Sequence, residues 1–164
     1  MLYFMPLRQA RPSLAETAIS AIGWGLICPL TVWANYFFWK HLHPHEGFKA
    51  VVIFSAGAAL VAPLAFWMAK LIGRKSLFSA FAAMFVTLGL STIAITAVLF
   101  ALDFWWYFSQ WHAPTFSKLW AIQFAFTFAS AVYQFLVSGL RLYLPFSLVA
   151  LIIASMWAAR RIMR

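Results

Sequence analysis

Residues 119–141 read LWAIQFAFTFASAVYQFLVSGLR, a stretch that is apolar enough to lie in a bilayer yet carries regularly spaced polar side chains. These polar positions are separated by four, three, four, four and three residues, which is the spacing of one helix face. We call them the polar stripe: Gln123, Thr127, Ser130, Gln134, Ser138 and Arg141. A helix in hydrocarbon must turn such a stripe towards other helices or towards water. The stretch therefore predicts a helix bundle around it.

The composition indicates that the solvent of this chain is lipid. Hydrophobic residues make up 65% of the 164 residues and charged residues only 9%, whereas a soluble domain is about 45–50% apolar and about 25% charged. A water-soluble protein of this size has too little interior to bury that much apolar surface. We therefore expect an integral membrane protein of the all-α class, a polytopic helix bundle in contact with the lipid bilayer.

The apolar runs predict one transmembrane domain over residues 18–164, preceded by an interfacial segment at residues 1–17. Ser13 and Glu16 form a capping box that favours a helix start at the membrane surface. One helix over residues 119–159 would be about 60 Å long, about twice the hydrocarbon thickness of about 30 Å, so the last run is predicted to be a separate span. The five predicted spans are 18–39, 48–72, 77–102, 119–141 and 144–159, with an aromatic belt at 103–117.

Charge, in contrast, favours four spans, because Lys and Arg gather on the cytoplasmic side of membrane proteins. With four crossings, eight basic residues share one side, and these are Arg8, Arg11, Lys70, Arg74, Lys75, Arg160, Arg161 and Arg164. The other side then has Lys40, Lys49 and Lys118. Five crossings divide the basic residues six and six. Length thus predicts five transmembrane helices, and charge predicts four with the last segment re-entrant or packed at the surface.

The net charge of +9 does not indicate a nucleic-acid partner. The basic residues lie between apolar runs or at their ends, as at Lys70, Arg74 and Lys75, which is the usual pattern beside transmembrane helices. A nucleic-acid site would gather them on one soluble face. We therefore expect no nucleic acid among the partners, which are the bilayer and either other membrane subunits or further copies of this chain.

Histidines form the sharpest local signal, and they predict a transition-metal site. His41, His43 and His45 alternate in sequence, so their side chains would share one side of an extended loop. If the spans alternate, His112 lies in a loop on the same side of the membrane. Neutral imidazoles suit Zn²⁺, Cu²⁺, Ni²⁺ or Co²⁺. The alternative is a hydrated loop that happens to be rich in histidine, since the spacing matches no closed zinc signature.

The inventory of reactive groups predicts no enzymatic activity and, apart from that metal, no cofactor. The only carboxylates are Glu16, Glu46 and Asp103, and no nucleophile motif is present. Haem would need axial ligands inside the bundle, and no predicted span contains a histidine. The single cysteine, Cys28, excludes an intrachain disulfide.

The polar stripe has a structural and a functional interpretation. Its residues can bond to neighbouring helices, at about 0.6 kcal/mol for each bond, or they can line a path for a polar solute. Small residues on another side of the same helix, Ala121, Ala125 and Ala129, allow a second helix to come close. The expected partner for the stripe is the third span, whose polar face consists of Thr87, Ser91, Thr92 and Thr96.

Two functions follow from these features. The first is a non-enzymatic accessory or scaffold subunit that packs against other membrane proteins, which the lack of acidic residues within the spans favours. The alternative is a small homo-oligomeric transporter or channel whose histidine-rich loop collects metal. The absence of long hydrophilic loops, disulfides and glycosylation sequons fits a bacterial inner membrane.

Overall fold

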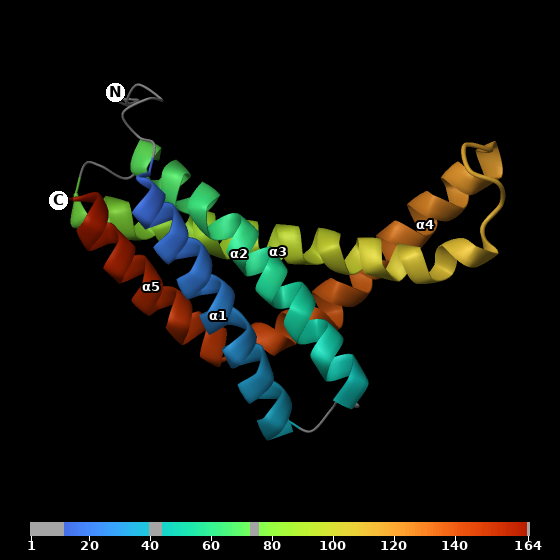
Figure 1. The fold of residues 1–164 in the computed structure, drawn as a ribbon, viewed down its shortest axis with the longest axis horizontal. Coiled ribbons are helices and arrows are strands. Elements are labelled where there is room, and N and C mark those ends of the chain that lie inside the picture. Colours follow the sequence, from blue (N-terminus) through green and yellow to red (C-terminus); the bar gives the residue numbers. More distant parts are fainter. Residues whose placement is uncertain (1–11, 40–43, 73–75, 164) are drawn as a thin grey trace.

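The computed structural model describes residues 12–39, 44–72 and 76–163, and this part of the chain is helical almost throughout and contains no strand (Figure 1). The five long helices are α1 (Leu14–Trp39), α2 (Pro44–Ile72), α3 (Leu77–Phe108), α4 (Lys118–Gln134) and α5 (Phe146–Ile162). The predicted all-α class is confirmed.

Four segments are long and apolar enough to cross a membrane, as in a small multi-pass membrane protein. They are residues 14–35 in α1, 48–72 in α2, 77–111 in α3 and its continuation, and 118–143 in α4 and its continuation. The fifth helix, α5, has 17 residues, about the shortest length that can span a bilayer.

The predicted helix start at Ser13 is confirmed, and a second serine, Ser76, caps the start of α3. In the capping box, the Ser13 N–H donates to Glu16 Oε2 at 2.8 Å and the Glu16 N–H donates to Ser13 Oγ at 3.2 Å. The Ser76 hydroxyl accepts from the Ser79 N–H at 3.1 Å. These bonds satisfy backbone donors that a helix start leaves without intrahelical partners.

Four helices form a closed bundle, because α1 packs against α2 and α5, and α3 packs against the same two helices. An ion pair between Lys70 Nζ and Glu16 Oε2, at 2.8 Å, joins the end of α2 to the beginning of α1. The C-terminal end of α5 lies beside this pair of helix ends, at the left of Figure 1. Lys70, Arg160 and Arg161 therefore share one end of the bundle, which we call the basic end.

Three of the six described basic residues lie at the basic end, and the other three, Lys49, Lys118 and Arg141, lie elsewhere, so the described residues do not decide between four and five crossings. The course of α4 is nevertheless not that of an alternating crossing, because it packs along the C-terminal part of α3 and runs back towards the bundle instead of lying along it (Figure 1). Consequently α3 leads away from the basic end, α5 returns to it, and α4 adds no passage between the two ends.

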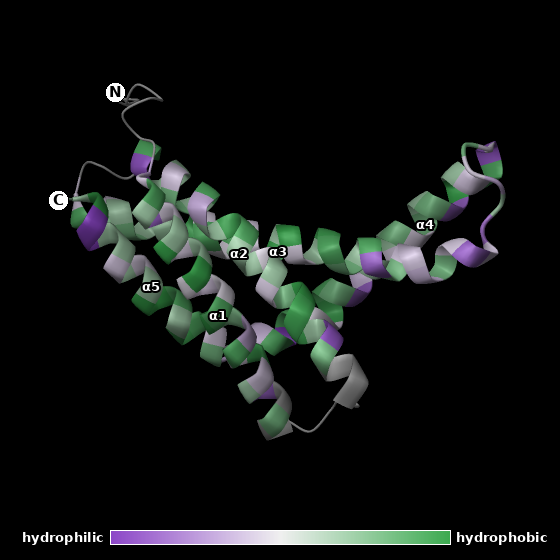
Figure 2. Ribbon diagram, in the orientation of Figure 1, coloured by the Kyte–Doolittle hydropathy of each residue, from purple (hydrophilic) through white to green (hydrophobic). Residues whose placement is uncertain are grey.

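The C-terminal part of α3 and the whole of α4 form an arm that stands away from α1 and α5 (Figure 1). The third helix was expected to end near residue 102, but it continues to Phe108 and then into a 3₁₀ turn at Ser109–Trp111. The first helix breaker after residue 102 is Pro114, so nothing in the sequence stops the helix earlier. Figure 2 shows hydrophobic residues over most of the helices and hydrophilic ones at the tip of the arm.

The arm joins α5 through a segment of irregular helix. A π-helical turn at Phe135–Gly139 and a 3₁₀ turn at Leu140–Tyr143 replace the α-helix that was predicted to reach Arg141. Phe135 is buried, with its ring centroid 6.0 Å from those of Phe54 and Phe100. The buried ring fixes the arm to the bundle at the point where the helix changes its pitch.

Candidate functional site

The threonines of α3 are bonded inside the bundle. Trp24 Nε1 donates to Thr92 Oγ1 at 3.0 Å, and the Tyr143 hydroxyl donates to Thr96 Oγ1 at the same distance. Thr87 donates to the carbonyl oxygen of Ala83, one turn earlier in its own helix. The expectation that this face of α3 would pair with the polar stripe is therefore wrong, because α1, α2 and the 3₁₀ turn already occupy it.

The first two members of the polar stripe close the tip of the arm. The Ala113 N–H donates to Gln123 Oε1 at 2.8 Å, and the Thr127 hydroxyl lies 3.2 Å from His112 Nε2. Trp105 on α3 packs edge-on against Phe124 on α4, with ring centroids 5.5 Å apart. These contacts hold α4 against α3, so this part of the stripe has a structural role within the chain.

The other four members of the polar stripe are exposed, and within the described residues none of their side chains has a hydrogen-bond partner. We call Ser130, Gln134, Ser138 and Arg141 the open part of the stripe. Ala131 is the one residue of α4 that is fully buried, and exposed apolar side chains such as Val137 and Tyr133 lie next to the open part. A polar group on an apolar helix surface is costly in hydrocarbon unless another group bonds to it.

The small residues of α4 are also left without a neighbour. Ala121, Ala125 and Ala129 are all exposed, because α4 packs on α3 with another face, which includes Phe124 and the buried Ala131. The close helix approach that these alanines predict is therefore not made by any described helix of this chain.

A second polar cluster, which the sequence did not reveal, lies where α5 begins. Asn35 of α1 is 1% exposed, and its Nδ2 donates to the Leu142 carbonyl oxygen at 2.7 Å. Its Oδ1 has no partner among the described residues. Nearby, the hydroxyls of Thr31 and Ser147 are hydrogen-bonded to each other. Irregular backbone within a membrane is tolerated where other protein groups satisfy it and shield it from lipid. Asn35 does this for one carbonyl group of the 3₁₀ turn.

Asn35 has a signal in the sequence that could have identified it. It is the only asparagine of the chain and follows an apolar run, and an amide in such a place usually has a bonding partner. Its partner could not be predicted, because Leu142 is more than a hundred residues away and offers only its backbone.

The predicted metal ligands are not brought together in the described part of the chain. His41 and His43 lie outside the described residues, and His45 lies in the first turn of α2, where the sequence predicted an extended loop. Pro44 begins that helix, a position that proline favours because its missing N–H is not needed there. His112 contacts Thr127 in the arm. Among the described residues no group of three possible metal-ligand side chains is found, so the metal site stays a prediction.

Asp103, one of the three carboxylates of the sequence, is used in an ion pair. Lys49 Nζ lies 2.9 Å from Asp103 Oδ2, joining α2 to α3 at the point where the arm leaves the bundle. The pair is accessible, with 62% of the lysine side chain and 36% of the aspartate side chain exposed. Its role is therefore explained by electrostatics between two helices.

Comparisons with known proteins add no family to this description. A scan against protein-family models found no match, and searches of curated proteins and of solved structures found no similar chain.

Proposed function

We propose that this chain is a non-enzymatic accessory or scaffold subunit of a complex in a bacterial inner membrane, and that α4 is its docking helix. The observation that carries the proposal is the open part of the polar stripe, with Ser130 and Gln134 on α4, which packs mainly against α3, and Ser138 and Arg141 in the irregular turns that follow it. Polar side chains of this kind bond across helices in membrane proteins.

The surface of α4 fits a partner helix better than lipid. Lipid tails offer no hydrogen bond to the Gln134 amide, whereas a polar side chain on a neighbouring helix does. The exposed alanines Ala121, Ala125 and Ala129 lie on the opposite side of α4 from the stripe, where they would let the backbone of a second helix approach closely. Arg141, at the end of the stripe, can extend its guanidinium to the headgroups or to an acidic group of the partner.

The test is co-purification of the tagged chain from its own membrane in mild detergent, followed by native mass spectrometry. The variant Gln134→Leu removes the amide and keeps the side-chain volume similar. We expect wild-type chain to bring down a defined set of membrane subunits and Gln134→Leu to lose them. Gln110→Leu is the matched control, because Gln110 is exposed at the tip of the arm and lies outside the stripe. Equal recovery of the same partner with Gln134→Leu would refute the proposal.

One observation favours the alternative, a small homo-oligomeric transporter or channel. The unpartnered Oδ1 of Asn35 lies next to a break between two helices, and transporters place solute sites at such breaks. The same mass spectra distinguish the two functions, because a complex made only of copies of this chain, carrying a transition metal, would favour transport. If replacing His41, His43 and His45 by Ala removed that metal, the histidine-rich loop would be the metal-binding entrance of the transporter.

A further inference from the structure

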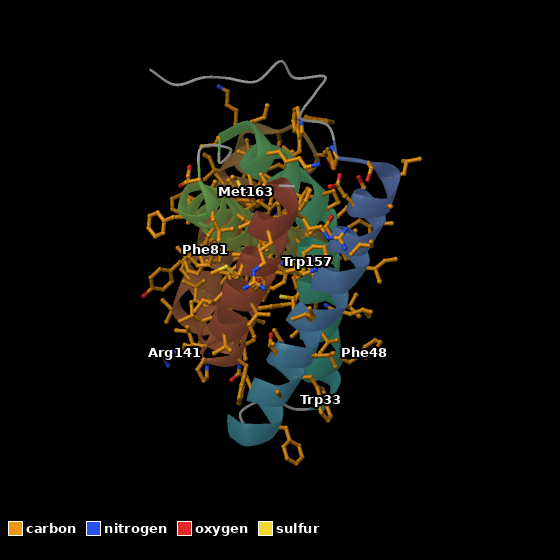
Figure 3. All side chains as sticks on the ribbon, turned by 90° about the vertical axis from the view of Figure 1, so that its left-hand side faces the viewer. Trp33, Phe48, Phe81, Arg141, Trp157 and Met163 are labelled. Carbon is orange, nitrogen blue, oxygen red and sulfur yellow. The ribbon has the colours of Figure 1, made fainter. Side chains whose placement is uncertain are left out.

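A cavity of about 390 Å³ lies between α1 and α5, with residues of α2 and α3 as its floor. Its volume falls within the range of about 300–1,000 Å³ that is usual for small-molecule sites. Its walls include Ile19, Gly23 and Ile27 from α1 and Ala154, Ile153 and Trp157 from α5. Ile153 is 64% exposed and Trp157 is 40% exposed, so the cavity is a groove that opens at the side of the bundle. Figure 3 shows the position of Trp157 beside α1.

The groove presents no free polar group to an occupant. Its two polar side chains are already bonded, since the Ser20 hydroxyl donates to the Thr17 carbonyl oxygen and Trp24 Nε1 donates to Thr92 Oγ1, each at 3.0 Å. The part of a ligand that lies in the groove must therefore be hydrocarbon. Because the groove opens sideways from helices that are apolar enough to cross a membrane, the tail of a lipid can enter it from the bilayer.

A cationic side chain lies at the end of the groove that is nearest the basic end of the bundle. The Arg161 guanidinium carbon lies 5.2 Å from the centre of the Trp157 ring, which is itself part of the groove wall. Ala150, Ala154, Trp157 and Arg161 are separated by four, three and four residues, so they share one face of α5. Arg160 lies off that face. Lys70, at the same end of the bundle, is already paired with Glu16, whereas Arg161 has no carboxylate partner among the described residues.

We propose that this groove binds one anionic phospholipid of the surrounding bilayer, with an acyl chain between α1 and α5 and the phosphate at Arg161. A guanidinium binds phosphate oxygens through paired hydrogen bonds, and basic residues at the membrane surface attract anionic headgroups. The apolar groove favours the acyl chain of the lipid, and the arginine at its end favours the negative charge of the headgroup. The site is separate from α4 and does not depend on the docking role of that helix.

Gly23 offers a way to fill the groove without disturbing the bundle. A Cβ added at this position would meet nothing within 4 Å, so a leucine side chain here would occupy the space of the lipid tail. Leucine also has a higher helix propensity than glycine. Ala154→Leu fills the groove from the opposite wall and gives a second, independent variant. Helical circular dichroism and thermal unfolding in detergent check that both variants fold.

The test is native mass spectrometry of the detergent-solubilised protein titrated with phosphatidylglycerol and with phosphatidylcholine of the same acyl chains. We expect wild-type protein to retain one phosphatidylglycerol more tightly than phosphatidylcholine, and Gly23→Leu and Ala154→Leu to lose that lipid. Arg161→Gln should lower the affinity for phosphatidylglycerol about fivefold, equivalent to about 1 kcal/mol, and remove the preference for the anionic lipid. Arg160→Gln removes the same charge from the same turn and should leave the preference intact.

Three results would overturn the proposal. The first is retention of phosphatidylglycerol by both folded groove-filling variants at the wild-type level. The second is equal loss of affinity in Arg160→Gln and Arg161→Gln, which would show that only the summed charge of the helix end matters. The third is a groove-dependent dimer in place of a lipid adduct, which would assign the groove to a second copy of the chain.

Discussion

The bundle and the arm use the same kinds of residue to different effect. In the bundle, Asn35, Thr92 and Thr96 are bonded to other segments of the chain, and Gly25 and Gly57 allow neighbouring helices to come close. In the arm and the irregular turns after it, the four residues of the open part of the stripe and the alanines Ala121, Ala125 and Ala129 face outwards. This contrast indicates that polar and small residues in an apolar helix mark places where another helix packs. Where no helix of the described chain packs against them, we expect a partner protein to do so.

The largest expected effect comes from crowding a close helix contact in the bundle. A Cβ added to Gly57 would lie 2.5 Å from Thr96 Oγ1 and 3.3 Å from the Thr96 Cα, so α2 and α3 must move apart. We expect Gly57→Val to lower the free energy of unfolding by about 3 kcal/mol or more, the upper range for an overpacked core. Unfolding in mixed micelles of mild detergent and dodecyl sulfate measures it.

Gly23→Ala is the matched control for this variant, because the added methyl group at Gly23 has open space around it. It should leave stability unchanged or raise it slightly through helix propensity. Similar losses of stability in the two variants would mean that any side chain on these glycines is harmful, and the close contact at Gly57 would lose its explanation.

An amide in the bundle and an amide in the arm give the sharpest comparison. Asn35→Leu leaves the partly buried Leu142 carbonyl oxygen without its donor, so we expect the free energy of unfolding to fall by about 1–3 kcal/mol. Gln134→Leu removes an amide with no described partner, and the isolated chain should keep its stability within about 0.5 kcal/mol. Partner binding should show the reverse order, with Gln134→Leu losing the complex. Equal destabilisation of the isolated chain by the two variants would contradict the distinction between bundle and arm.

Local features of the fold could be predicted from the sequence because short-range chemistry determines them. The capping box of Ser13 and Glu16 and the cap at Ser76 are satisfied within a few residues, so their pattern is sufficient. The apolar runs likewise identify the helices, since length and hydropathy are properties of the segment alone. The end of α3 was misjudged because its aromatic residues suggested an interface, although no helix breaker precedes Pro114.

The arrangement of the helices could not be predicted, because periodicity identifies a face and not its partner. The spacing of the polar stripe correctly indicates one side of a helix, yet Gln123 and Thr127 bond within the arm whereas Gln134 has no described partner. That division depends on the direction in which α4 leaves the bundle, which the buried Phe135 and the irregular turns after it determine. The groove beside Trp157 is likewise a product of packing between helices that are distant in sequence.

The smallest expected effect concerns the ion pair where the arm leaves the bundle. Lys49→Gln should change the free energy of unfolding by less than about 0.5 kcal/mol, because 62% of the Lys49 side chain is exposed and accessible ion pairs contribute little. Lys70→Gln should cost about 1 kcal/mol, since Lys70 and Glu16 are only 17% and 22% exposed and Lys70 also lies 5.0 Å over the ring of Phe66. Salt should weaken the first pair more than the second.

The effect of Lys49→Gln on stability also shows whether Asp103, at the base of the arm, is in contact with water. If hydrocarbon surrounded Asp103, removal of Lys49 would leave an unpaired carboxylate in a medium of low dielectric constant, and the loss of stability would be several kcal/mol. A small, salt-dependent effect therefore places the Lys49–Asp103 pair within reach of water. A large effect would place this pair among the lipid tails as well, together with the open part of the stripe, whose polar side chains need a partner there.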